Sequence, residues 1–166
     1  ITTIRFLEEV KIKGIIININ SIGCKVCRPT YKKKLQDYYK SVQSTICKDC
    51  KRRLAVNPLR LLDCKEPQCA DVKVKAPITL DHLCTACRHH FKAVLEYLDD
   101  VGLPYALDHR LVRGLDYYNR TVFEVFLEGS GLALGGGGRY DYLGEILGAR
   151  KTTLPAVGSA LGLERI

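Results

Sequence analysis

Eight cysteines in four closely spaced pairs are the residues of this chain best suited to hold a metal ion. Three pairs have the spacing C-x-x-C and one has C-x4-C. Two intervening residues allow both sulfurs of a pair to reach one tetrahedral ion at about 2.3 Å. The eight are Cys24, Cys27, Cys47, Cys50, Cys64, Cys69, Cys84 and Cys87.

The spacing leaves open which pairs would share an ion. Joining the first pair to the second gives C-x2-C-x19-C-x2-C, which lies within the range of structural zinc sites. Joining the third pair to the fourth gives C-x4-C-x14-C-x2-C, which comes close to that range. The second pair could also share an ion with the third. Unliganded thiols and disulfides are the competing interpretations, but disulfides suit a secreted chain and no secretory signal is visible. We expect structural zinc, since four protein sulfurs leave no open position for water.

A second set of candidate residues lies in the last third of the chain. The run GGGGRY at 135–140 would let a ligand lie against the backbone, although it matches neither a Walker nor a G-x-G-x-x-G loop, and a flexible hairpin is the alternative. Arg113 and Arg165 offer planar, bidentate donors for phosphate, with surface ion pairs as the alternative. An aromatic wall for a flat polar ligand is offered by Tyr117, Tyr118 and Tyr140.

Periodicity predicts the elements that must position these groups. Residues 14–23 and 121–127 have the β-branched or alternating pattern of strands, and residues 4–11 fit the end of a helix. Residues 129–143 predict a glycine-rich turn that leads into a short helix. Further helices are predicted at 29–42, at 47–64 with a break at Asn57-Pro58, at 83–102 and at 155–166.

The positive charge of the chain is confined to its middle. Residues 24–95 hold 16 Lys and Arg against 6 Asp and Glu, whereas residues 96–166 hold 7 against 10. Such a surplus suits a phosphate backbone as partner, with a solvated surface as the alternative. We therefore expect an α+β protein in which residues 1–23 and 96–166 form an antiparallel sheet and residues 24–95 form a helical, cysteine-rich insertion. No apolar run is long enough for a membrane span.

Three stretches resemble one enzyme family. LVRGLDYYNRTVFE (111–124) and GGGGRYD (135–141) resemble the two signatures of histidyl-tRNA synthetases, and PAVGSALGLER (155–165) is similar to motif 3 of class II aminoacyl-tRNA synthetases. Stretches within residues 18–91, such as NINSIG and LCTACRHHF, are similar to the segment that these enzymes insert between motifs 2 and 3. The resemblance covers nearly the whole chain in the right order.

The resemblance implies a cytoplasmic, homodimeric histidine–tRNA ligase. Such an enzyme uses ATP with Mg²⁺ to form histidyl-adenylate and then transfers histidine to tRNA(His). It implies that Arg113 contacts the α-phosphate and the histidine carboxylate, and that Tyr118 and Tyr140 contact the imidazole with Tyr117 beside them.

For the nucleotide, the resemblance implies Arg165 at the γ-phosphate, Gly162 below the adenine and Glu124 on the pocket floor. It also implies that the basic insertion lies against the tRNA acceptor stem through phosphate contacts. The candidate contacts there are Lys51, Arg52 and Arg53.

The chain departs from the family pattern in what it lacks. Motifs 1 and 2 and the anticodon-binding domain are missing, Ser159 stands where motif 3 usually has an aromatic residue, and the chain does not begin with Met. We expect a fragment of a longer protein that is inactive alone. Two alternatives are a non-catalytic paralogue that regulates ATP phosphoribosyltransferase and a zinc-stabilised tRNA-binding module. The intact Arg113, Tyr118 and Arg165 favour the enzyme.

Overall fold

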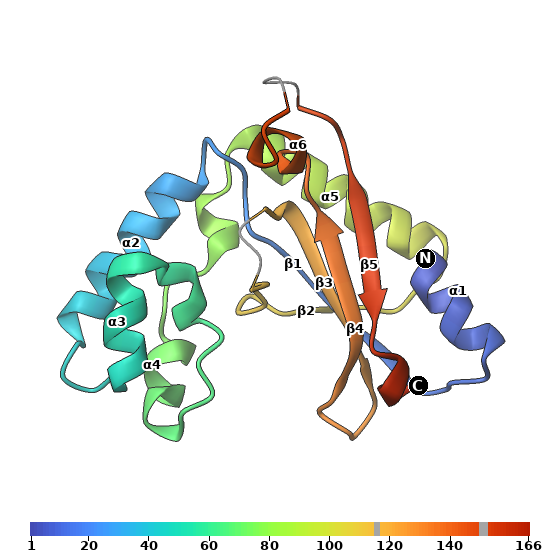
Figure 1. Cartoon of the computed structure of the whole chain (residues 1–166), viewed down its shortest axis with the longest axis horizontal. Coiled ribbons are helices and arrows are strands. Elements are labelled where there is room, and N and C mark those ends of the chain that lie inside the picture. The colour runs from blue at the N-terminus through green and yellow to red at the C-terminus, as the bar shows by residue number, and fades with distance from the viewer. Residues whose placement is uncertain (115–116, 150–152) are drawn as a thin grey trace.

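The structure of the chain, a computed structural model, describes residues 1–114, 117–149 and 153–166 (Figure 1). Its α-helices are α1 Thr2–Glu9, α2 Arg28–Ser41, α3 Lys48–Val56, α4 Ala70–Val74, α5 Thr85–Asp100 and α6 Leu143–Ile146. Its strands are β1 Ile15–Ser21, β2 Ala106–Leu107, β3 Asn119–Leu127, β4 Ala133–Arg139 and β5 Val157–Leu161. Short 3-10 helices are η1 Pro58–Leu61, η2 Pro67–Cys69, η3 Thr79–His82 and η4 Leu163–Arg165.

The strands form one mostly antiparallel sheet in the order β2-β1-β3-β4-β5. The short β2 runs parallel to β1, and each of the other neighbouring pairs is antiparallel. Segments at the two ends of the sequence thus lie side by side in this sheet, as Figure 1 shows. The predicted α+β class is confirmed, and so are the strands at 14–23 and 121–127.

The glycine run was predicted to be a turn, and that prediction is wrong. The four glycines belong to β4, between β3 and β5, and the turn of the hairpin comes earlier, at 128–132. A Cβ on Gly137 would lie 2.1 Å from the carbonyl oxygen of Gly158 in β5. Glycine is needed here because the backbones of the two strands approach closely, not because the chain turns.

The helix predicted at 155–166 is also wrong. Residues Val157–Leu161 form the edge strand β5, and only Leu163–Arg165 coil into the 3-10 turn η4. Small residues recur at every second position from Ala156 to Gly162. That period places them on one face of a strand, where Gly158 leaves space for the Tyr140 side chain.

Helices α1 and α5 cover one face of the sheet (Figure 1). Ile4 and Leu7 of α1 are buried against Ile17 of β1, Val125 of β3 and Leu134 of β4. Burial of such apolar side chains drives their packing, at roughly 25 cal/mol per Å² of area removed from water. Among the described helices, none is both long and apolar enough to cross a membrane.

Helices α2, α3 and α4 gather to one side of the sheet around a hydrophobic cluster of their own (Figure 1). Tyr31 and Leu35 of α2 and Cys50 of α3 are almost fully buried in it. The predicted break at Asn57-Pro58 is confirmed, because α3 ends at Val56, Asn57 has a non-helical backbone (φ −147°, ψ 87°) and Pro58 begins η1. The helices predicted at 29–42 and 83–102 are confirmed as α2 and α5.

Candidate functional site

Arg113 and Glu124 meet above the middle of the sheet. Arg113 lies in the connection between β2 and β3, and its Nη1 donates to Oε1 of Glu124 in β3. About a quarter of each side chain is exposed. Gly136 of β4 lies beneath them, since a Cβ there would come within 2.9 Å of Arg113 Nη1. The guanidinium is therefore held by one carboxylate and keeps further donors for a ligand.

Three tyrosines form a cluster beside this pair. The ring centroids of Tyr117 and Tyr118 are 4.7 Å apart, and those of Tyr118 and Tyr140 are 6.1 Å apart. Burial and then Tyr117 raise the pKa of Tyr118, while Arg113 opposes that shift, so the Tyr118 hydroxyl keeps its proton at neutral pH. Gly138 leaves the space for the Tyr118 ring, because a Cβ there would lie 2.9 Å from it. Residues 115 and 116 of the same predicted signature lie outside the described residues.

A buried polar network that the sequence did not single out holds the base of this tyrosine cluster. Asp141 accepts hydrogen bonds from Asn119, Arg139 and the backbone of Ala156. Burial alone would raise the pKa of the Asp141 carboxyl, but these donors, Arg139 foremost, lower it below its ordinary value. The network joins the ends of β3 and β4 to the segment before β5. Its signal was the Asp that follows Tyr140 in GGGGRYD.

A pocket of about 600 Å³ opens from Arg113 and Glu124 toward the C-terminal turn. Gly162 and Arg165 line it, and they are tied to β4 because Gly162 donates its N–H to Leu134 and Arg165 donates to the carbonyl of Ala133 at 2.6 Å. The structure thus brings together four of the predicted residues. It adds two residues of the middle segment that the sequence analysis missed, Asp63 and Lys65.

The three predicted tRNA contacts lie elsewhere, on α3, and none of them lines this pocket. Arg52 and Arg53 both pair with Asp49, one turn earlier on the same helix. Lys51 is exposed. Two of the three cations are therefore partly neutralised, and exposed pairs of this kind are weak enough to exchange Asp49 for a phosphate.

The eight cysteines form two separate groups of four. Cys24, Cys27, Cys84 and Cys87 make the outer cluster, at the junction with the sheet, and Cys47, Cys50, Cys64 and Cys69 make the inner cluster, among the helices. Within each group all sulfurs lie within 4.8 Å of one another, and none forms a disulfide. The first pair therefore joins the fourth and the second joins the third, a nested arrangement that the spacing left open.

The sulfur positions fit a tetrahedral ion. A tetrahedron with 2.3 Å bonds has edges of about 3.8 Å. The Sγ atoms of Cys24 and Cys27, and those of Cys24 and Cys84, are 3.8 Å apart, and those of Cys47 and Cys64 are 3.9 Å apart. Burial opposes ionisation of Cys24, but backbone N–H groups of Cys27 and Val26 lower its pKa to about 7. Both clusters could hold a metal ion such as zinc.

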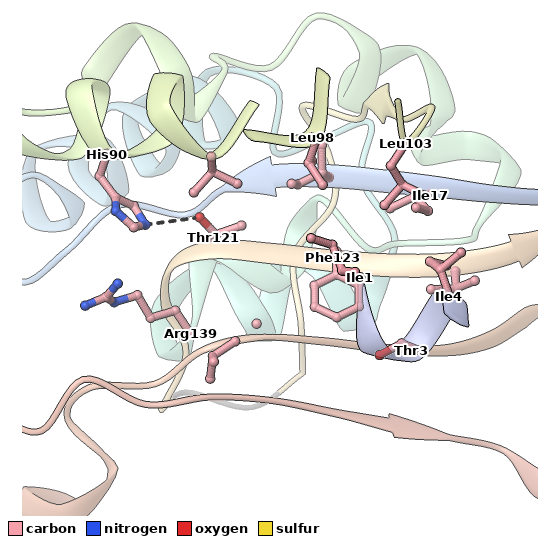
Figure 2. A pocket seen from close by; sticks show the side chains of 15 residues that line it. Ile1, Thr3, Ile4, Ile17, His90, Leu98, Leu103, Thr121, Phe123 and Arg139 are labelled. Atoms are coloured by element: carbon pink, nitrogen blue, oxygen red, sulfur yellow. Dashed lines mark hydrogen bonds between the residues drawn. The ribbon is translucent and has the colours of Figure 1, made fainter. Parts of the chain in front are cut away.

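A second pocket, of about 300 Å³, lies on the opposite face of the sheet, between α5 and the strands (Figure 2). Its walls are apolar, with Leu98 of α5 facing Ile17 and Phe123. Polar groups occur mainly at one end, where His90 Nε2 lies 3.5 Å from Thr121 Oγ1. Burial, and then Arg139, lower the pKa of His90. None of the predicted site residues lines this pocket.

Comparison with known proteins places these features in one family. Residues 53–166 match the family model for histidyl-tRNA synthetase. The chain is 51% identical to a histidine–tRNA ligase of Nitratidesulfovibrio vulgaris, in a match that covers 98% of this chain and 39% of the relative. It is 48% identical to a histidine–tRNA ligase of Symbiobacterium thermophilum, in a match that covers 92% of this chain and 35% of the relative.

A solved structure agrees with this assignment. The crystal structure of apo S. aureus histidyl-tRNA synthetase is similar to the chain with a TM-score of 0.73 and 32% identity, over 98% of this chain and 40% of that one. The chain thus spans about two fifths of the length of these relatives. With this agreement of sequence and fold, the chain belongs to the histidyl-tRNA synthetase family.

Proposed function

We propose that the chain is part of the catalytic domain of a histidine–tRNA ligase. In the first step a carboxylate oxygen of histidine attacks the α-phosphorus of ATP, which forms histidyl-adenylate and releases pyrophosphate. In the second step a hydroxyl of the terminal ribose of tRNA(His) attacks the adenylate carbonyl and releases AMP. The reaction requires ATP as substrate with Mg²⁺, which would offset phosphate charge when bound.

The observation that carries the proposal is the linear order of three groups along β4. Tyr118 lies over Gly138, Arg113 lies over Gly136, and Arg165 donates a hydrogen bond to the carbonyl oxygen of Ala133. Five residues of strand span roughly 17 Å. Histidine, the α-phosphate and the remainder of ATP would follow one another in the same order when the two substrates are aligned for reaction, so together they could contact all three groups.

Each group has chemistry that suits its place in this order. The protonated hydroxyl of Tyr118, with Tyr117 and Tyr140, would bind the imidazole. Arg113 would contact the carboxylate and the α-phosphate and stabilise the negative charge that develops on the phosphate oxygens. Because Arg113 already pairs with Glu124, the ligand competes with that carboxylate, or shares the guanidinium with it through its remaining donors.

At the nucleotide end, Arg165 would bind the γ-phosphate and Gly162 would lie under the adenine. The 3-10 turn η4 brings both residues to the mouth of the 600 Å³ pocket. Glu124 would form the floor between the two ends. This arrangement supplies one wall of the site, and the remainder would come from other parts of the full-length enzyme.

Residues 24–95 would act as an insertion domain between the core segments 1–23 and 96–166. We propose that it binds the tRNA acceptor stem through its positive charge, with Lys51, Arg52 and Arg53 among the contacts, in a cytoplasmic homodimer. Each tetracysteine cluster would hold one structural zinc ion, because the measured separations of its sulfurs match the edges of a zinc-sized tetrahedron. Metal analysis of the full-length protein should give about two zinc ions per chain from these clusters, and an absence of zinc would refute this part.

The ligase proposal is tested by Arg113→Ala in the full-length protein, assayed by histidine-dependent exchange of pyrophosphate into ATP. We expect a rate lower by about 10²-fold or more, as for other groups that stabilise transition-state charge. Arg110→Ala is the matched control, because Arg110 lies in the same connection and half of its side chain is exposed. Undiminished exchange by the Arg113 variant would refute its role, and no exchange by the unaltered protein would refute the function.

A further inference from the structure

The outer cluster does more than close the insertion, because its ligands adjoin β1 and α5, which both contact β3, the strand that directly follows Tyr118. Cys24 follows β1 after only two residues, with Cys27 three positions later, and Cys84 and Cys87 stand at the start of α5. We propose that a zinc ion in the outer cluster positions the tyrosine cluster, and that Arg28, the residue after Cys27, transmits this effect. The inference rests on the proposed ligase function and deepens it.

Arg28 joins the two strands at the edge of the tyrosine cluster. Its Nη2 donates to the carbonyl oxygen of Tyr118 at 2.6 Å and to that of Gly23 at 3.2 Å, and its Nε donates to Ile22 at 3.2 Å. The Arg28 guanidinium thus donates to three carbonyl groups, of which two follow β1 and one lies just before β3. Hydrogen bonds from a charged donor are roughly twice as strong as neutral ones. Arg28 is therefore a positioning residue for the Tyr118 backbone.

The position of Arg28 depends in turn on the cysteines beside it. Gly23 has a φ of +69°, and a Cβ there would lie 2.7 Å from the sulfur of Cys27. The chain therefore turns tightly between β1 and the cluster. Because Arg28 directly follows Cys27, a shift of the Cys27 sulfur would also shift the Arg28 backbone from which the guanidinium extends. An ion bonded to Cys27 fixes the first turn of α2 and, with it, the base of the Arg28 side chain.

Two further contacts reach the same region from the outer cluster. Lys25, between the first two ligands, pairs with Glu145 and lies 4.0 Å from the centre of the Tyr142 ring, just beyond Tyr140 in sequence. His90, one turn after Cys87 on α5, faces Thr121 at the start of β3 (Figure 2). Both halves of the ligand set are thus tied to segments that carry the tyrosines.

The inner cluster provides a natural comparison. Among the described residues, its four cysteines make hydrogen bonds only within the insertion, for example Cys47 with Cys69 and Cys64 with Lys73. An ion there would hold the helices together but would have no direct link to Tyr118. The two sites therefore predict different consequences for one lost ligand, although their sulfurs are arranged alike.

The test uses four single variants of the full-length protein. Cys84→Ser is compared with Cys64→Ser as its control, and Arg28→Gln is compared with Arg88→Gln as its control. Arg88 is an exposed arginine next to Cys87, so it matches the charge change. In pyrophosphate exchange, which needs no tRNA, we expect Cys84→Ser and Arg28→Gln to raise the KM for histidine about tenfold or more while the KM for ATP changes less than about twofold. Arg28→Gln should keep two zinc ions, whereas Cys84→Ser should lose one.

A readout without catalysis separates this inference from the ligase proposal. Hydrogen exchange of residues 117–122 should accelerate in Cys84→Ser and Arg28→Gln but not in the two control variants. If the unaltered protein shows no exchange of pyrophosphate, this measurement still decides the inference. The inference would be overturned if Arg28→Gln and Arg88→Gln had the same effect on hydrogen exchange and on the KM for histidine. It would also be overturned if Cys84→Ser and Cys64→Ser had the same effects, or if the KM for ATP rose in parallel with that for histidine.

Discussion

A single methyl group added to Gly137 should separate β4 from β5. The new Cβ would lie 2.1 Å from the Gly158 carbonyl oxygen and 2.8 Å from the Cα of Ser159, whereas an ordinary contact begins near 3.4 Å. Both neighbours are backbone atoms, so no side-chain rotation can relieve the clash. Strand β5 must move by about 1 Å, which stretches the nearest ladder hydrogen bonds beyond their useful range.

The cost can be worked out from these contacts. Two lost ladder hydrogen bonds contribute about 1 kcal/mol each, and residual strain adds about 1–2 kcal/mol. A loss of about 3–4 kcal/mol corresponds to roughly 100-fold to 1000-fold faster amide exchange. Hydrogen exchange of the segment Val157–Leu161 in the full-length Gly137→Ala protein should therefore accelerate about 100-fold or reach the unprotected rate.

Gly144→Ala is the matched control, since the nearest atom to its new Cβ is the Cβ of Ala149 at 3.8 Å. It should change exchange in β5 less than about threefold. Protection of β3 should survive in both variants, which excludes global unfolding as the cause. Unchanged exchange of β5 in Gly137→Ala would refute the close approach of the two strands as the reason for this glycine.

Two further predictions concern charge. Replacing Lys51, Arg52 and Arg53 with alanine should weaken tRNA binding and make its salt dependence shallower, by up to about one unit of slope per lost phosphate contact; an unchanged slope in a binding titration would place the tRNA elsewhere. Because Asp141 has a lowered pKa in the folded protein, its contribution to stability is present above the ordinary pKa of 3.8 and is lost as the pH falls through the folded value. The difference in melting temperature between the unaltered protein and Asp141→Asn should accordingly shrink below about pH 4, and a difference that is independent of pH would contradict this account.

The sequence predicted the helices α2, α3 and α5 and the inner strands β1 and β3 well, because their signals are local. Pro58 ends one helix, and the β-branched run in β1 defines a buried strand. The turn predicted at the glycine run was wrong because glycine suits both a turn and a close contact between strands. Only the position of β5 beside β4 shows that the second applies here. The last strand was within reach, since small residues at every second position from Ala156 to Gly162 have the period of a strand and not of a helix.

The grouping of the cysteines could not be predicted in the same way. Pair spacing specifies how two sulfurs meet one ion, but the partner pair depends on how the chain folds between them. Here the chain leaves the sheet after β1 and returns at α5, so the cysteines at the two crossings meet each other. The Asn119 and Asp141 contact was hidden for the same reason, because 22 residues separate its partners.

Two contacts of the insertion, one apolar and one polar, fall directly beside the candidate histidine-binding residues. Val112, directly before Arg113, packs against the hydrophobic cluster of the helices and also against the cluster that contains Tyr118. Arg28 makes the polar contact through the carbonyl of Tyr118. Both contacts fall at the imidazole and α-phosphate end of the pocket, whereas Gly162 and Arg165 donate hydrogen bonds to Leu134 and Ala133 at the start of β4. A displacement of the insertion, such as tRNA binding would cause, should therefore alter histidine binding before it alters nucleotide binding.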